Sequence, residues 1–155
     1  NVISDKITSS VYEINRDTVA LIPKDNDKTV VYETDKSFVV NETPIKIMEN
    51  SCEFFGSSLE GRQKATTKII GVTHKVPVIV SETFNLIFFP TSSPRNNDCI
   101  WLSYSHIFKP SKFNNHTLLE LVSGKKIILN VSTGIIDNQL YRASRLKYIL
   151  QIRKK

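Results

Sequence analysis

The sequence predicts an α+β fold in which short antiparallel strands dominate one domain and two helices pack beside them. Three observations lead to this expectation. Short apolar runs recur along the chain between clusters of Asn, Asp, Gly and Pro, which is typical of strands and turns. Helix signals occur near residue 58, and the apolar spacing becomes helical near residue 136. The chain has 155 residues, of which 40% are hydrophobic, so residues 1–155 suit a single domain with one core.

The first forty residues are predicted to form an antiparallel meander. Turn segments at residues 15–17, 23–27 and 34–35 separate apolar runs that favour extended structure. The expected strands cover residues 11–14, 19–22, 29–33 and 36–40.

A short helix is predicted near residues 58–68. Ser57 and Glu60 have the spacing of a capping box, in which each side chain binds a free amide at the helix start. Gly61 lowers the helix propensity. On this helix Gly61, Lys64 and Lys68 share one stripe, where a missing side chain and two cations let a phosphate approach the backbone.

Further strands are predicted in the middle of the chain, at residues 76–80, 84–89 and 100–104. Pro77 indicates that the first of them lies at a sheet edge or a bulge. The last two are joined by a loop over residues 90–98, which Pro90 and Pro94 stiffen. A hairpin is then expected from residues 118–122 and 126–131.

A C-terminal helix is predicted near residues 136–154, with one apolar stripe for the core. Its second face mixes aromatic, basic and aliphatic residues, which is unusual for a helix with only solvent beyond it. We therefore expect another chain, or a further C-terminal segment, to cover this face. The residues predicted for an oligomer interface are Tyr141, Tyr148, Ile149 and Ile152.

The charge of the chain is distributed unevenly. The net charge is +6, and residues 110–155 carry 9 basic and 2 acidic residues, whereas residues 1–50 carry 6 and 9. Such asymmetry favours binding of a polyanion by the middle and C-terminal parts. The acidic N-terminal third is expected to face away from it.

Metal binding, catalysis and membrane insertion find little support in the sequence. Cys52, His74, Cys99 and His106 are suitable zinc ligands, but they lack the short spacing that lets one loop hold a metal. No residue provides an orienting partner for a Cys/His pair, and there is no phosphate-binding glycine loop. We therefore predict no metal, no cofactor and no catalytic activity. The two cysteines do not make a disulfide framework, so a reducing cytoplasm is the expected location. No apolar run approaches membrane-spanning length.

The loop after residue 90 carries the sharpest candidate site. Small hydroxyls and amides reach sugar and base-edge acceptors in a narrow groove, while a guanidinium is attracted to the negative potential of an A/T-rich minor groove. The alternative is an ordinary strand connection that is polar because it is exposed. The candidate residues are Ser92, Ser93, Arg95, Asn96 and Asn97.

A second group of residues is suited to phosphate, where contacts add affinity and salt dependence but little sequence information. Taken singly, each of these lysines is more often a solvated surface residue, and a histidine before a strand is commonly a structural residue. Arg142 and Arg145 are candidates for either DNA contact or dimer support. The remaining candidates are Arg62, Lys64, Lys68, His74 and Lys75.

Four islands of sequence carry a family resemblance. They are Ser51-Cys52-x-Phe54-Phe55-Gly56-Ser57-Ser58-x-x-Gly61-Arg62, His74-Lys75-x-Pro77-x-x-Val80, Phe88-Phe89-Pro90-Thr91-x-Ser93, and Cys99-x-Trp101 with His106-Ile107. Weaker similarity continues near residues 12–14, 123–125 and 138–142. In these islands and in their order, the chain resembles the competence transcription factor family of bacteria, ComK.

The resemblance implies a sequence-dependent DNA-binding activator of competence genes. Family members recognise paired A/T-rich boxes, largely through the minor groove, with several subunits on one promoter. Minor-groove readout mainly separates A·T from G·C, so groove width, bendability and box spacing would supply specificity.

The expected partners are double-stranded DNA with A/T-rich boxes and further copies of the chain; the resemblance adds a proteolytic adaptor and RNA polymerase. Family members continue beyond the position of Lys155, in a region associated with oligomerisation and adaptor capture. The chain begins without Met, which indicates a fragment or a processed form. Two other classes stay open, a protein-interaction module without DNA binding and a Cys/His metalloenzyme.

Overall fold

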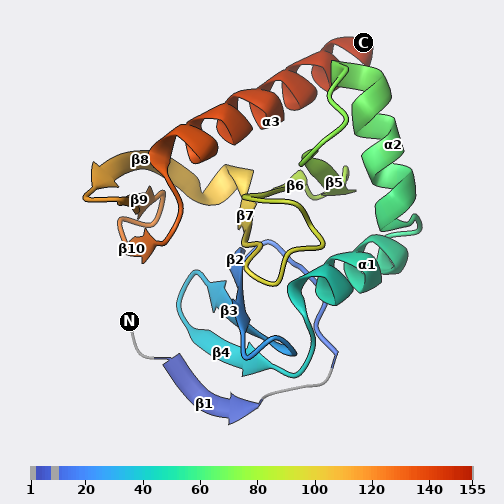
Figure 1. The fold of residues 1–155 in the computed structure, drawn as a ribbon. Coiled ribbons are helices and arrows are strands. Elements are labelled where there is room, and N and C mark those ends of the chain that lie inside the picture. Colours follow the sequence, from blue (N-terminus) through green and yellow to red (C-terminus); the bar gives the residue numbers. More distant parts are fainter. Residues whose placement is uncertain (1–2, 8–10, 155) are drawn as a thin grey trace.

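The computed structural model describes residues 3–7 and 11–154 (Figure 1). Its larger sheet has the strand order β1-β4-β3-β2-β7-β6-β5. Neighbouring strands run antiparallel, except that β1 runs parallel to β4. The strands are β1 (Ile3–Ile7), β2 (Thr18–Lys24), β3 (Lys28–Glu33), β4 (Ser37–Val40), β5 (Val78–Ser81), β6 (Leu86–Pro90) and β7 (Trp101–Ser103).

A smaller antiparallel sheet and three helices complete the described structure. The small sheet has the order β10-β9-β8, and a 3-10 turn, η1 (Tyr104–His106), leads into it from β7. Its strands are β8 (Ile107–Phe113), β9 (His116–Leu121) and β10 (Lys126–Leu129). The helices are α1 (Pro44–Phe54), α2 (Leu59–Ile70) and α3 (Thr133–Arg153). In Figure 1, α3 runs beside the small sheet, and α1 and α2 follow one side of the molecule.

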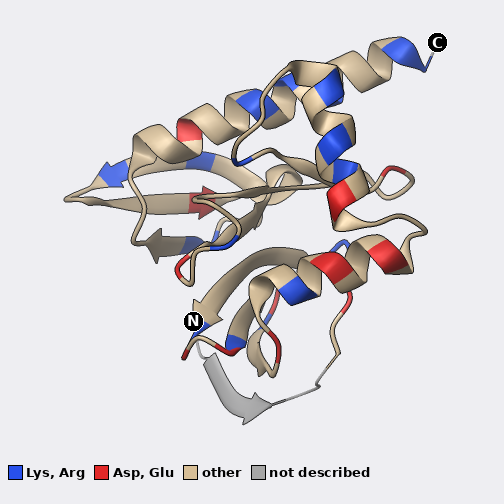
Figure 2. Ribbon diagram, turned by 45° about the vertical axis from the view of Figure 1, so that its right-hand side comes forward, with Lys and Arg blue, Asp and Glu red and all other residues tan. Residues whose placement is uncertain are grey.

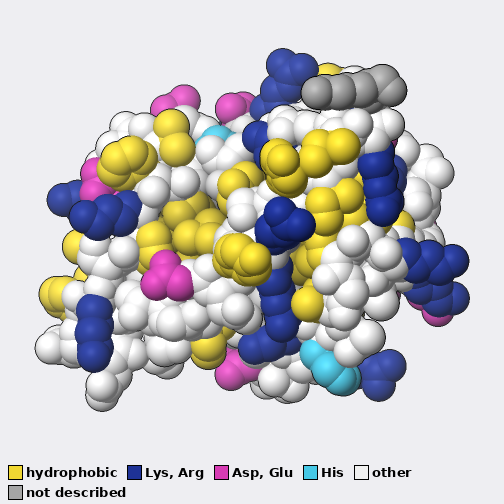
Figure 3. Space-filling model, turned by 90° about the horizontal axis from the view of Figure 1, so that it is seen from above, with side chains coloured by type: hydrophobic (Ala, Val, Ile, Leu, Met, Phe, Trp, Pro, Cys, Tyr) yellow, Lys and Arg dark blue, Asp and Glu magenta, His cyan; other side chains and the backbone are white. Residues whose placement is uncertain are grey.

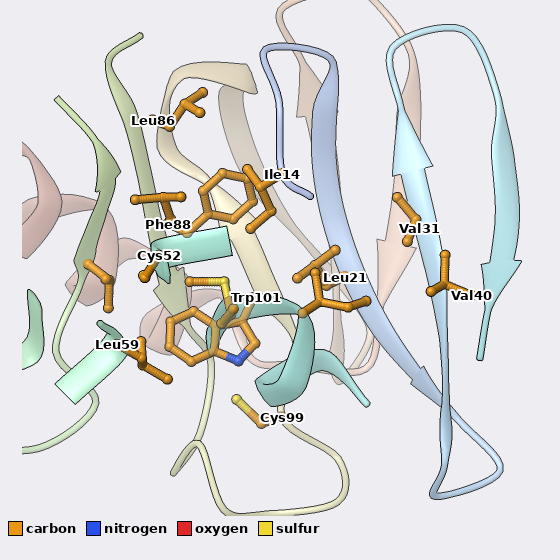
Figure 4. Packing of buried hydrophobic residues seen from close by; sticks show 14 of the residues in the cluster. Ile14, Leu21, Val31, Val40, Cys52, Leu59, Leu86, Phe88, Cys99 and Trp101 are labelled. Atoms are coloured by element: carbon orange, nitrogen blue, oxygen red, sulfur yellow. The ribbon is translucent and has the colours of Figure 1, made fainter. Parts of the chain in front are cut away.

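The large sheet separates two hydrophobic clusters, because successive side chains of a strand point to opposite faces. Phe88 and Trp101 belong to the cluster that α1 covers, whereas Phe89 and Leu102 belong to the cluster under α3 and the small sheet. All four side chains are fully buried. Figure 4 shows Phe88 and Trp101 in the first cluster, close to Cys52 of α1. Both faces of the sheet are therefore covered, and the helices lie at fixed positions against it.

Much of the expected architecture is confirmed. The fold is α+β with mainly antiparallel strands and a C-terminal helix. The meander from β2 to β4 and the hairpin of β9 and β10 pair as predicted. The strands expected at residues 76–80, 84–89 and 100–104 are β5, β6 and β7, with bounds shifted by one to two residues.

The strand predicted at residues 11–14 is absent, and that prediction was wrong. The backbone amide of Ile14 donates to the Ser51 hydroxyl of α1 at 2.9 Å instead of to a neighbouring strand. The Ile14 side chain is 1% exposed and packs in the cluster under α1. The apolar pattern of this segment thus reflects burial against a helix rather than membership of the sheet.

The helix starts also differ from their predictions. The cap of α2 is Ser58 rather than Ser57, since the Ser58 hydroxyl accepts from the Gly61 amide at 3.0 Å. The Ser57 amide instead donates to the Cys52 carbonyl, in the connection between α1 and α2. α3 begins at Thr133, before the expected start near residue 136. No helix in the described ranges combines the length and the apolar character that crossing a membrane requires.

The sequence analysis missed β1, α1 and β8. α1 has recognisable start signals, because the Thr43 hydroxyl accepts from the Lys46 amide and Pro44 occupies the first turn, where its missing N–H costs nothing. β8 lacks a clear strand pattern, with Lys109, Pro110 and Lys112 interrupting its apolar residues. It forms by pairing with β9.

Candidate nucleic-acid interface

A surface groove of about 770 Å³ lies between three segments that are distant in sequence. One wall is α2, the second is the segment of residues 73–76 before β5, and the third is the loop between β6 and β7. Six residues predicted for DNA binding line it together: Lys64, Lys68, His74, Lys75, Ser93 and Arg95. The groove is therefore rich in cationic side chains, with Glu60 contributing one carboxylate.

The orientation of α2 follows from its buried face. Leu59 and Thr66 are buried, and the Thr66 hydroxyl donates to the Pro77 carbonyl at 2.7 Å. This contact holds the helix against the start of β5 and leaves Lys64 and Lys68 exposed. Lys64 lies 3.7 Å from Glu60, but both side chains are well exposed, so this pair is weak and leaves the lysine available to a polyanion.

The loop between β6 and β7 is held in one conformation by its own backbone. The Asn96 amide donates to the Ser93 carbonyl at 2.9 Å, and the Cys99 amide donates to the Asn96 carbonyl at 3.2 Å. The Thr91 hydroxyl accepts from the Ile100 amide at 3.1 Å. Arg95 is thus exposed at the tip of a braced turn.

The five loop residues predicted for one site do not share one surface. Ser93 and Arg95 face the groove. Asn96 and Asn97 line a neighbouring hollow of about 270 Å³, next to the start of α1, and Arg95 lines this hollow as well as the groove. Ser92 lies in a third hollow, and its hydroxyl is 3.4 Å from an Asp98 carboxylate oxygen. Only part of the loop therefore joins the lysines.

Arg62 lies away from the groove. It is half-buried near Cys52, and its Nε atom is buried without a hydrogen-bond partner in the described structure. Successive residues of a helix turn by about 100°, so Arg62 points away from Lys64 and Lys68 and toward Cys52 of α1.

Arg142 and Arg145 occupy different environments on α3. An Arg142 guanidinium nitrogen donates to the His74 carbonyl at 2.8 Å, so this side chain braces a wall of the groove. Arg145 is exposed and lies over the ring of Tyr148, with its guanidinium carbon 5.7 Å from the ring centroid. The sequence analysis missed Gln139, the fully buried neighbour of Arg142 on α3.

The predicted oligomer face of α3 is largely exposed. Tyr141 is 65% exposed, Tyr148 55% and Ile152 48%, whereas Ile149 is half-buried. Figure 3 views the molecule from the side on which α3 lies, and apolar side chains alternate there with Lys and Arg. Figure 2 shows Lys and Arg along α2 and α3, while acidic residues gather on α1.

The cysteine and histidine residues do not assemble into a metal site. In the described ranges, no group of three or more His, Cys, Asp or Glu residues could hold a metal ion. Cys52 and Cys99 are buried, and the His106 ring is engaged by the Arg16 carbonyl at 2.6 Å. Burial raises the pKa of the Cys52 thiol to about 11, against a smaller opposing effect of Arg62, and burial also raises the pKa of Cys99.

These thiols are expected to be unreactive in the folded protein. The thiolate is the reactive form, and raised pKa values keep both groups protonated until the pH rises well above 8. Iodoacetamide at pH 8 should leave Cys52 and Cys99 unmodified in buffer and alkylate both in concentrated urea. Mass spectrometry of the intact protein measures this, and rapid labelling in buffer would contradict the burial of the thiols.

The fold and the groove define an α+β protein with a cationic surface cleft built from α2, the segment before β5 and the loop after β6. A family model described as "ComK protein" matches residues 9–155, and the chain belongs to this family. A similar protein is the competence transcription factor of Bacillus subtilis (strain 168). It is 35% identical over 147 residues, which cover 92% of this chain and 76% of that protein. No match was found among solved structures.

Proposed function

We propose that this protein is a DNA-binding transcriptional activator of competence genes, which recognises paired A/T-rich boxes largely through the minor groove. The observation that carries the proposal is the groove, where cationic residues from three segments face one cleft. The name of the Bacillus subtilis relative, a competence transcription factor, supports the same function. Family membership also favours gene regulation over catalysis.

The chemistry of the groove suits the sugar-phosphate backbone. Lys64 and Lys68 project from α2, and Lys75 faces them from the segment before β5. Lysine ammonium groups bind phosphate as mobile point charges, which positions a protein on DNA without reading its sequence. Neutralisation of phosphates releases counterions, so affinity should fall steeply as salt rises.

Arg95 is the residue best suited to enter the minor groove. It is exposed at the tip of a braced turn, beside Ser93 and Pro94 at the edge of the cleft. The minor groove is about 6 Å wide and becomes narrower and more negative in A-tracts, where arginine is preferred. With Arg95 in the minor groove, the lysines of the cleft would follow one of the flanking strands.

A second candidate function is protein interaction through α3. The exposed Tyr141, Tyr148 and Ile152 favour it, because large apolar side chains on one helix face commonly mark contact sites. We propose that this face joins copies of the chain on DNA. A proteolytic adaptor, RNA polymerase and a nucleoid-associated cytoplasmic location are further parts of the proposal.

The test is a fluorescence-anisotropy titration across a salt series. One duplex carries two spaced A/T tracts, and the other is G/C-rich and of equal length. We expect about tenfold or more preference for the A/T duplex. If the three lysines of the groove each meet one phosphate, the slope of log K against log salt is about −3 per subunit.

Equal, weak binding to both duplexes would mean that the groove binds DNA through its charge alone, without preference for A/T-rich sequence. No binding even at low salt, together with self-association that salt does not weaken, would favour the protein-interaction module. The two candidate functions are thus separated by one pair of measurements, DNA affinity and sedimentation of the free protein.

A further inference from the structure

A buried polar side chain of α3 links two of the three walls of the groove, the segment before β5 and the loop after β6. Gln139 of α3 is 0% exposed. Its amide nitrogen donates to the Lys75 carbonyl and to the Pro90 carbonyl, both at 2.7 Å, and its amide oxygen accepts from Arg142 at 3.3 Å. Two carbonyl acceptors require the NH₂ group at this position, so the orientation of the amide is fixed by its surroundings.

The two carbonyls belong to different walls of the groove. Lys75 is in the segment before β5, whereas Pro90 ends β6 immediately before the loop that carries Ser93 and Arg95. Arg142 adds a second contact to the first wall, through the His74 carbonyl at 2.8 Å. α3 therefore holds two consecutive carbonyls of one wall and the base of the other.

The backbone of Lys75 explains why this wall needs a brace. Its φ is +52°, in the left-handed region that a lysine adopts only at a cost in conformational energy. The hydrogen bonds from Gln139 and Arg142 fall on the two carbonyls that flank this torsion, those of His74 and Lys75. Without them, the segment is free to relax to an ordinary backbone conformation, and the Lys75 side chain changes direction.

We propose that Gln139, assisted by Arg142, is a positioning residue that sets the separation of Lys75 and Arg95 across the groove. This inference rests on the proposed function only for its DNA readout, since the brace itself is a property of the free protein. It also changes the expectation for Arg142, whose charge contributes through the backbone of His74 rather than through a phosphate.

A double-mutant cycle tests the proposal on DNA. Gln139→Met keeps the volume but removes the three hydrogen bonds, and we expect about tenfold weaker binding to the A/T duplex. Lys75→Ala should lower the steepness of the salt dependence by about 1 in the wild-type background. In the Gln139→Met background, Lys75→Ala should change almost nothing, because the lysine is already misplaced.

Matched controls separate positioning from general loss of structure. Asn138→Ala alters the exposed neighbour of Gln139 on α3, and should bind DNA as the wild type does. Lys126→Ala removes an exposed charge of β10, far from the groove, and should combine additively with Gln139→Met. If Lys75→Ala and Gln139→Met are also additive, Gln139 does not act through this wall and the proposal is overturned.

A measurement without DNA keeps the two proposals distinguishable. Hydrogen exchange followed by mass spectrometry should be faster in Gln139→Met for peptides covering residues 72–77 and 89–95, and unchanged in Asn138→Ala. If Gln139→Met does not fold, Arg142→Met replaces it, with faster exchange expected at residues 72–77 alone. Unchanged exchange in Gln139→Met would refute the brace. Faster exchange in Gln139→Met, together with a wild type that binds no DNA, would leave the brace and refute the proposed function.

Discussion

Reversal of two charges, Lys68→Glu together with Arg95→Glu, should abolish binding to an A/T-rich duplex while the protein stays folded. The two residues face one groove from different walls, so the substitutions place two carboxylates along the proposed DNA path. We expect affinity to fall by about 100-fold or more at moderate salt, since two attractive contacts become repulsive ones. Both side chains are exposed, and the free energy of unfolding should change by less than about 1 kcal/mol.

The control for this prediction carries the same change in net charge at a different place. Lys112→Glu with Lys126→Glu alters two exposed lysines of the small sheet, on β8 and β10. Anisotropy with the A/T duplex should show a loss below about fivefold for this control, from the weaker overall field of the protein. Equal losses in the two double variants would mean that net charge rather than the groove determines binding. Unchanged binding in the first variant would place the DNA elsewhere on the surface.

Local signals account for the parts of the fold that the sequence predicts well. The turns of the meander and of the β9–β10 hairpin are set by residues next to the strands they join, and the helical period of α3 is visible over its length. The insertion of β7 between β2 and β6 depends instead on contacts between distant segments. No local pattern encodes that order, and the same holds for the parallel pairing of β1 with β4.

The candidate site divides in the same way. Residue chemistry singles out Lys64, Lys68 and Arg95 as suited to DNA, and the structure brings them to one groove. Gln139 was not predicted because the carbonyls that its side chain binds, those of Lys75 and Pro90, lie 64 and 49 residues away along the chain. Arg62 shows the opposite case, since its sequence context suits phosphate but the turn of α2 directs it toward Cys52.

The largest loss of stability is expected from Phe88→Ala. Phe88 lies on β6, where it is paired with Val78 of β5 and Ser103 of β7, and its side chain is 0% exposed. Removal of a fully buried phenylalanine ring forfeits its transfer free energy and leaves a cavity, which together cost about 3–5 kcal/mol. Domains of this size are stable by only about 5–15 kcal/mol, so the variant should be close to unfolding at 25 °C.

Urea denaturation followed by circular dichroism measures this loss, with Phe108→Ala as the matched control. Phe108 is 67% exposed on β8, and the same truncation there should change the free energy of unfolding by about 0.5 kcal/mol or less. Because β6 also leads into the loop that carries Arg95, partial unfolding of Phe88→Ala should lower DNA affinity in proportion to the folded fraction. A loss of stability as small as that of Phe108→Ala would mean that neighbouring side chains repack to fill the space of the missing ring. The groove would then keep its DNA affinity on a rearranged core.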